Sequence, residues 1–127
     1  MTEKGYFSPD IADLLATVRD TLKQVAPQLE RGPAYQLHVS GFLLELALRE
    51  LESGDTAAVH SQQRLSRLLG AEGSAVELTW KLCRALRAGA LDARWDEVLQ
   101  VLLEDNVERV RIVRPDVLAA EHRPQTT

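Results

Sequence analysis

Aliphatic residues recur along this chain at the spacing of an α-helix, and no other feature limits its fold as strongly. The first example is a run of apolar residues separated alternately by four and three positions: Ile11, Leu15, Val18, Leu22 and Val25. Such spacing places every member on one narrow face of a helix. Aromatic residues are only 5% of the sequence, so aliphatic side chains on helices must form the core. The pattern predicts an all-α, single-domain helical bundle and disfavours sandwiches and barrels.

Capping residues, glycines and prolines divide the chain into about five expected helices. Ser8 as N-cap predicts the start of the first helix, and Pro27 indicates that this helix ends near Val25. A second helix is expected over Ala34 to Glu52. Its apolar residues cover most of the circumference, as they do in a buried helix. The sequence therefore predicts that this second helix is the buried centre of the bundle.

Two further helices are expected in the middle of the chain. Gly54-Asp55 predicts that the second helix stops and that a third follows over Thr56 to Leu69. The segment Ser74-Ala75-Val76-Glu77 has the spacing of a capping box, in which the two polar side chains satisfy backbone amides at a helix start. A fourth helix is expected from this segment to Gly89.

The fifth expected helix begins at Asp92, whose carboxylate suits an N-cap, and Pro115 must end it. Its last part, Val110 to Val113, is β-branched and partly alternating, so the sequence leaves open a short extended segment there. We expect one helical domain over residues 1–127, with an ordered core at about 8–114 between a polar N-terminal lead and a polar C-terminal tail.

Length and charge exclude several classes of function. A chain of 127 residues has the usual size of one domain. The formal net charge of −4 gives no electrostatic reason to bind nucleic acid or an anionic membrane, since both require a basic surface. We expect neither partner. No apolar run reaches the roughly 20 residues of a membrane span.

Cysteine usage indicates the compartment. Cys83 is the one cysteine of the sequence, so it can form no internal disulfide. The residues Met1 to Asp10 lack the apolar core of a secretory signal. These observations favour a cytoplasmic protein, with Cys83 as structural filler on the apolar side of the fourth helix.

The sequence shows no recognisable catalytic or metal-binding pattern. His38, His60 and His122 are more than twenty residues apart, and none has a second ligand at the spacing of a known metal motif. The glycines form no phosphate-binding loop after a strand. The acidic pairs Asp96-Glu97 and Glu104-Asp105 are typical of solvated helix ends. We therefore expect no catalytic residue, no metal and no cofactor.

One basic cluster and one apolar helix face supply the candidate binding residues. Lys81, Arg84 and Arg87 follow one another at intervals of three on the fourth helix. They could bind a phosphate or a partner's carboxylates, and a solvated helix face is the alternative interpretation. A cavity beside the second helix would have Tyr35, His38 or Trp80 at its mouth, while His38 also suits the edge of a core. The candidate ligand or partner surface comprises Tyr35, His38, Arg49, Trp80, Lys81, Arg84 and Arg87.

Several short segments carry a resemblance to a known family. They are Asp13-Leu14-Leu15, Val18-Arg19, Pro27-Gln28-Leu29-Glu30-Arg31-Gly32, Arg49-Glu50-Leu51, Leu68-Leu69-Gly70, Arg87-Ala88-Gly89-Ala90-Leu91-Asp92 and Asp105-Asn106. With them the chain resembles an uncharacterised family of small bacterial helical proteins, encoded beside aminoglycoside-phosphotransferase-like kinases and acyl-CoA dehydrogenases. The chain departs from the family pattern at Gln36, Phe42 and Val107, where members tend to carry histidine, asparagine and proline.

The resemblance implies a functional neighbourhood rather than a reaction. The favoured hypothesis is a non-catalytic accessory protein that docks on the neighbouring phosphotransferase-like kinase or acyl-CoA dehydrogenase. The alternative is a small-ligand binding protein for an acyl or phosphorylated metabolite, with a pocket beside the second helix. An enzyme is the third hypothesis. The apolar spacing of the first helix also serves pairing between chains, so a homo-oligomer stays open under each of them.

Overall fold

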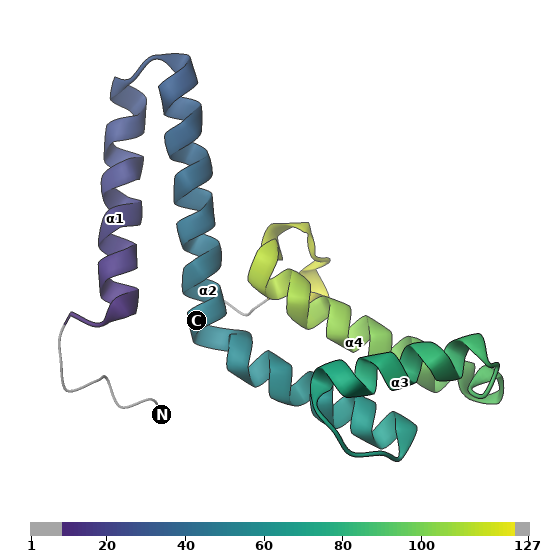
Figure 1. The fold of residues 1–127 in the computed structure, drawn as a ribbon. Coiled ribbons are helices and arrows are strands. Elements are labelled where there is room, and N and C mark those ends of the chain that lie inside the picture. The colour runs from purple at the N-terminus through teal and green to yellow at the C-terminus, as the bar shows by residue number, and fades with distance from the viewer. Residues whose placement is uncertain (1–8, 124–127) are drawn as a thin grey trace. The chain divides into compact units, whose positions relative to one another are not determined.

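The structure, a computed structural model, describes residues 9–123 and is built from α-helices (Figure 1). Its elements, in chain order, are α1 (Ile11–Val25), η1 (Ala26–Gln28), α2 (Arg31–Leu69), α3 (Ala75–Arg87), η2 (Asp92–Arg94), α4 (Trp95–Val113), η3 (Pro115–Val117) and η4 (Ala120–His122). The η elements are single 3₁₀ turns. No strand occurs within the described range, so the all-α prediction is confirmed. None of its helices combines the length and the apolarity needed to cross a membrane.

The chain divides into two compact units, residues 1–52 and 53–127. Helix α2 contributes its residues up to Glu52 to the first unit and those from Ser53 to the second.

The first unit is an antiparallel hairpin of α1 and the first part of α2 (Figure 1). Helix α1 begins with a capping box: the Asp10 carboxylate accepts from the amide of Asp13 at 2.8 Å, and the Asp13 carboxylate accepts from the amide of Asp10 at 3.3 Å. The predicted N-cap, Ser8, lies outside the described residues, and the cap of the observed helix is Asp10. An ion pair between Lys23 and Glu45 links the two helices.

The prediction of a buried central helix over residues 34–52 is wrong. Of these residues, all of which the structure describes, only Gly41 is buried. Tyr35 is 69% exposed and Leu43 is 56% exposed. A helix that is apolar nearly all round needs neighbours on every side to be buried. Within its unit this stretch has one helical neighbour, α1, which covers only one side.

The predicted break at Gly54-Asp55 is also wrong, because α2 continues through it to Leu69. One glycine inside a helix costs only about 1 kcal/mol relative to alanine, and no proline follows to remove a backbone donor. The helix ends where expected, at Gly70, whose φ of 59° suits glycine. The described residues therefore contain four α-helices and not five.

The second unit has its own hydrophobic core, contributed by the C-terminal part of α2, by α3 and by α4. The buried residues of this core are Leu65, Leu68, Leu78, Leu82, Leu91 and Val98. The predicted capping box is confirmed: the Ser74 hydroxyl accepts from the amide of Glu77 at 3.2 Å, and the Glu77 carboxylate accepts from the amide of Ser74 at 2.9 Å. Gly89, with φ of 73°, follows the end of α3.

Helix α4 differs from its prediction at the start and agrees with it at the end. Asp92 is not the cap, because Asp92–Arg94 forms a 3₁₀ turn before Trp95 opens the helix. The segment 110–113 is helical, so the extended alternative does not apply. Leu118, beyond the expected limit of the ordered core, is buried.

Candidate functional site

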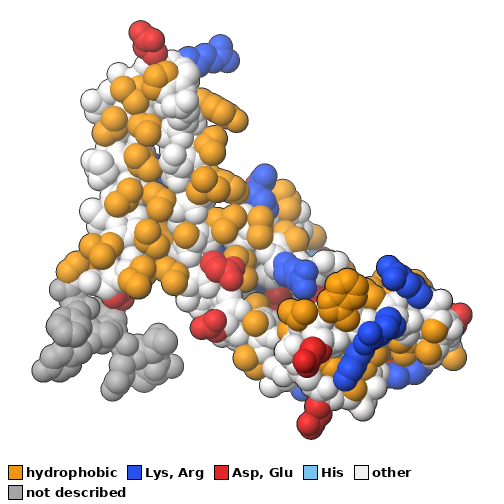
Figure 2. All heavy atoms as spheres, viewed as in Figure 1, with side chains coloured by type: hydrophobic (Ala, Val, Ile, Leu, Met, Phe, Trp, Pro, Cys, Tyr) orange, Lys and Arg blue, Asp and Glu red, His pale blue; other side chains and the backbone are white. Residues whose placement is uncertain are grey.

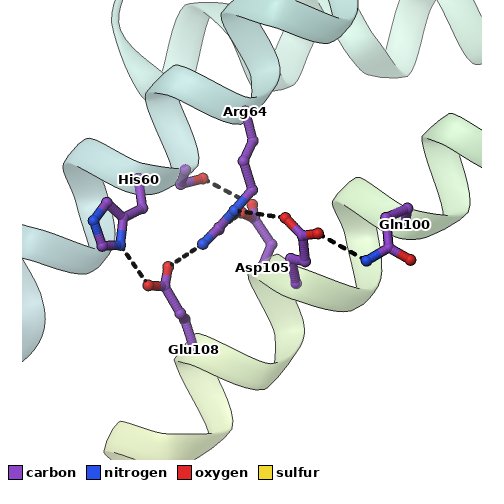
Figure 3. A network of polar contacts seen from close by, with 7 residues as sticks. His60, Arg64, Gln100, Asp105 and Glu108 are labelled. Carbon is purple, nitrogen blue, oxygen red and sulfur yellow. Dashed lines mark hydrogen bonds and ion pairs between the residues drawn. The ribbon is translucent and has the colours of Figure 1, made fainter.

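The largest polar cluster of the second unit surrounds Arg64 of α2, which faces three carboxylates of α4 (Figure 3). Arg64 Nη2 lies 2.7 Å from Glu108 Oε2, and its Nη1 lies 2.5 Å from Asp105 Oδ1. Its Nε lies 3.2 Å from Glu104 Oε2. The spacing of 104, 105 and 108 places all three acids on one side of α4. One guanidinium thus contacts three carboxylates from a single helix.

Neighbouring side chains extend this cluster along both helices. His60 Nδ1 lies 2.6 Å from Glu108 Oε1. The Ser61 hydroxyl donates to Asp105 Oδ2 at 2.7 Å. Gln100 Nε2 donates to Glu104 Oε1 at 2.7 Å, four residues away on the same helix (Figure 3). We call these seven residues the Arg64 network: His60, Ser61, Arg64, Gln100, Glu104, Asp105 and Glu108.

The contacts within the Arg64 network favour the charged forms of Glu108 and Arg64. Burial alone would raise the pKa of the Glu108 carboxyl. The hydrogen bonds with His60 and Arg64 have the opposite and larger effect, so this pKa lies below its ordinary value. Burial lowers the pKa of Arg64, while hydrogen bonds to Glu108 and Asp105 raise it to a greater extent. Both groups therefore stay charged at neutral pH.

The Arg64 network places a histidine–carboxylate contact near a serine hydroxyl. A histidine that contacts a carboxylate can act as a general base when a nucleophile lies against it. The nearby hydroxyl, Ser61, instead donates to Asp105. Within residues 9–123 no three histidine, cysteine, aspartate or glutamate side chains are grouped so that they could hold a metal ion. The contacts of the network run from His60 and Arg64 of α2 to Asp105 and Glu108 of α4, so the network joins the two helices as a clamp of charged groups.

A second feature of this unit is the outer side of α3. Leu78 and Leu82 point into the core, and Leu78 is fully buried. Residues four apart on the opposite side stay in solvent: Val76 is 67% exposed and Trp80 is 61% exposed. An exposed tryptophan on a helix that is anchored by its other side is an arrangement typical of protein-binding surfaces.

Two arginines continue the outer side of α3. Arg84 follows Trp80 by one helical turn and Arg87 lies one turn further, and both are exposed. Neither makes an ion pair within the part of the chain that the structure describes. Figure 2 shows such basic side chains beside hydrophobic ones over α3. We define the α3 face as Val76, Trp80, Arg84 and Arg87.

Lys81, which the sequence grouped with these arginines, lies beside the α3 face. A spacing of three residues turns successive side chains by about 60° around a helix, so Lys81 and Arg87 point in different directions. The ammonium group of Lys81 donates to the carbonyl oxygen of Glu72 at 3.3 Å. Lys81 thus contacts the loop before α3.

The other predicted site residues belong to the first unit. Tyr35 and His38 line an open hollow of about 600 Å³ with Arg31, Gly32 and Ala34. Arg49, further along α2, is half-buried and is not part of its wall. The structure therefore brings Tyr35 and His38 together in one unit, and Trp80 with Arg84 and Arg87 in the other.

The Arg64 network did not emerge from the sequence, where Glu104-Asp105 was interpreted as a solvated pair. A signal was present, because His60 and Arg64 are one turn apart, as are Glu104 and Glu108. The pairing of these two turns could not be recognised, since it joins residues at least 40 positions apart. An open groove of about 470 Å³ beside the network is lined by Arg64, Arg67, Leu68, Asp96, Glu97, Gln100, Val101 and Glu104.

These features describe an all-α protein with a charge-clamped second unit and an exposed Trp-Arg helix face. The chain matches the family model described as Domain of unknown function (DUF6285) over residues 27–117. This match covers more than half of the chain, and the chain belongs to that family. No curated protein and no solved structure matches it.

Proposed function

We propose that this protein is a non-catalytic accessory protein that binds a protein partner through the α3 face. The observation that carries the proposal is the exposure of Trp80 beside Arg84 on a helix whose opposite side is locked in the core. Tryptophan and arginine are the residues most enriched among those that dominate binding energy at interfaces. Because Leu78 and Leu82 anchor α3, these side chains are presented from a fixed helix, which lowers the entropy cost of association.

The chemistry of the α3 face defines the partner's surface. Trp80 and Val76 require an apolar pocket, and the arginines require carboxylates at its rim, where an arginine fork binds in bidentate fashion. The resemblance to a family encoded beside phosphotransferase-like kinases and acyl-CoA dehydrogenases suggests one of these two enzymes as the partner. A single cysteine that is half-buried, Cys83, fits a reducing cytoplasm as the shared compartment.

Co-expression with each enzyme, followed by size-exclusion chromatography and calorimetry, tests this function. Trp80→Ala should raise the dissociation constant at least about 30-fold, which corresponds to about 2 kcal/mol at a dominant interface residue. Trp95→Ala is the matched control, since Trp95 is 55% exposed but lies outside the α3 face. The proposal fails if neither enzyme co-elutes, or if the two alanine variants bind alike.

Charge reversal gives an independent arm of the same experiment. Arg84→Glu should weaken binding and reduce its dependence on salt, because the partner's rim is acidic. Arg109→Glu, at an exposed position of α4, is the control and should bind like the parent protein. Stronger binding of Arg84→Glu would contradict an acidic partner.

A second candidate function, the binding of an acyl or phosphorylated metabolite, has the hollow beside Tyr35 and His38 in its favour. Arg31 in its wall could receive an anionic group. We rank it second because one short stretch of α2 supplies all of its walls, whereas ligand pockets usually enclose about 70–90% of a ligand. Thermal-shift screening tests it: a ligand at 100 times its dissociation constant should add about 2.7 kcal/mol of stability, and Tyr35→Ala should remove that gain.

A further inference from the structure

The hairpin of the first unit lacks a core of its own. Among its described residues, 9–52, Ala26 at the turn is the one with a buried apolar side chain. The 44 described residues of this unit are close to the size, about 40 residues, below which a disulfide, a metal or oligomerisation is usually needed for stability. Cys83 belongs to the other unit, and the described residues group no metal ligands. Of these three means of stabilisation, oligomerisation is the one that remains for the hairpin.

The apolar stripe of α1 is half-buried along one edge and exposed along the other. Leu15 and Leu22 are half-buried in the hairpin. Ile11, Val18 and Val25 recur every seven residues and stay 65%, 50% and 37% exposed. A seven-residue repeat of exposed apolar side chains is the spacing by which helices pack on other helices. We define the hairpin face as Ile11, Leu14, Val18 and Val25 of α1 with Leu43 and Leu51 of α2.

The lack of charged members allows the hairpin face to pack against a second copy of itself. No member of the hairpin face is charged, so two copies of it can meet without like-charge repulsion or the burial of an ion. The charged residues of α1 lie at other positions, and several are already paired: Asp13 in the capping box, Arg19 with Asp20, and Lys23 with Glu45. Figure 2 shows hydrophobic side chains along both helices of the hairpin.

The hairpin offers an area of the order that a stable interface needs. Residues 31–52 of α2 form about 33 Å of helix, the 15 residues of α1 form about 22 Å, and each helix is about 10 Å wide. The projected area is then about 560 Å², compared with the roughly 800 Å² of accessible surface that each partner of a stable complex buries.

We infer that two copies of this chain associate through their hairpin faces and form an intermolecular four-helix bundle. Two antiparallel hairpins stacked face to face give the architecture in which each helix packs against two others. A two-fold axis then relates the copies, because the same surface serves on both sides. This surface is separate from the α3 face, so the inference goes beyond the proposed function.

Sedimentation equilibrium and light scattering of the full chain test the inference. We expect a mass of about twice the 14.1 kDa of one chain. Val18→Glu should raise the dissociation constant of the dimer at least about 100-fold, because it buries a charge in the interface. Val76→Glu is the matched control: it places the same charge at an exposed valine of α3 and should leave the dimer intact.

A charge at position 18 could also unfold the hairpin, so a second variant is needed. Val18→Ala raises helix propensity while it removes apolar contact area. It should weaken the dimer about tenfold with unchanged helicity in circular dichroism. The inference would be overturned if the parent protein stayed monomeric at 100 times the concentration of a typical assay. It would also be overturned if Val76→Glu weakened the dimer as much as Val18→Glu does. A parent protein that stays monomeric and unfolds on Val18→Glu would also overturn the inference.

Discussion

Replacing Arg64 with methionine should destabilise the second unit far more than the loss of a surface charge does. The guanidinium contacts Asp105 and Glu108, whose side chains are only 12% and 19% exposed. Its removal leaves both carboxylates facing each other with reduced access to water. Breaking a buried pair by removing one partner costs about 3–5 kcal/mol. Because some water reaches this cluster, we expect a value near the lower limit, about 3 kcal/mol. Glu104 adds little, since it is 46% exposed.

Denaturant unfolding followed by circular dichroism measures this loss. For a cooperative unit of this size, about 3 kcal/mol corresponds to a fall in melting temperature of about 12–24 °C. Arg109→Met is the matched control, since Arg109 is exposed on α4, and it should stay within about 0.5 kcal/mol of the parent. The double variant Arg64→Met/Glu108→Gln should recover part of the loss, because one uncompensated charge is gone. A loss below about 1 kcal/mol for Arg64→Met would refute the view of the network as a clamp.

Two further predictions concern acid stability and helix continuity. The pKa of Glu108 is lowered in the folded state, so its contribution to stability is complete above the ordinary value of 4.5 and is lost as the pH falls through the lowered value. The denaturant midpoint should therefore drop more steeply below pH 4.5 in the parent than in Glu108→Gln, and parallel curves would contradict this. Asp55→Ala should raise the free energy of unfolding by about 0.5 kcal/mol inside a continuous helix, whereas an N-cap role for Asp55 would make it fall by about 1 kcal/mol.

The sequence predicted those helix ends that local chemistry sets. Ser74 and Glu77 satisfy each other's backbone amides whatever the rest of the chain does, and Gly70 can adopt a positive φ on its own. The prediction failed at Gly54-Asp55, where the local signal is weak. A helical glycine and a mid-helix aspartate together cost little, and the residues on both sides favour continuation.

The residues of the candidate site also fall into two groups, those that the sequence predicted and those that it did not. Trp80, Arg84 and Arg87 were recognised from their types and spacing, and the structure adds that they share one exposed face with Val76. The Arg64 network escaped prediction, because its contacts join positions 60–64 to positions 104–108. No property of either segment alone identifies the other as its partner.

By itself the sequence determined that this chain is helical, where α3 begins and where the four observed α-helices end, because hydrogen bonds within one turn and the rotation of 100° per residue are local properties. Only the tertiary structure decided which apolar faces are covered. Residues 34–52 carry apolar side chains on most sides, but burial depends on the number of neighbouring helices, and their unit supplies just α1. The same dependence on distant neighbours made Arg64 the centre of an ion cluster and left Ile11, Val18 and Val25 in solvent.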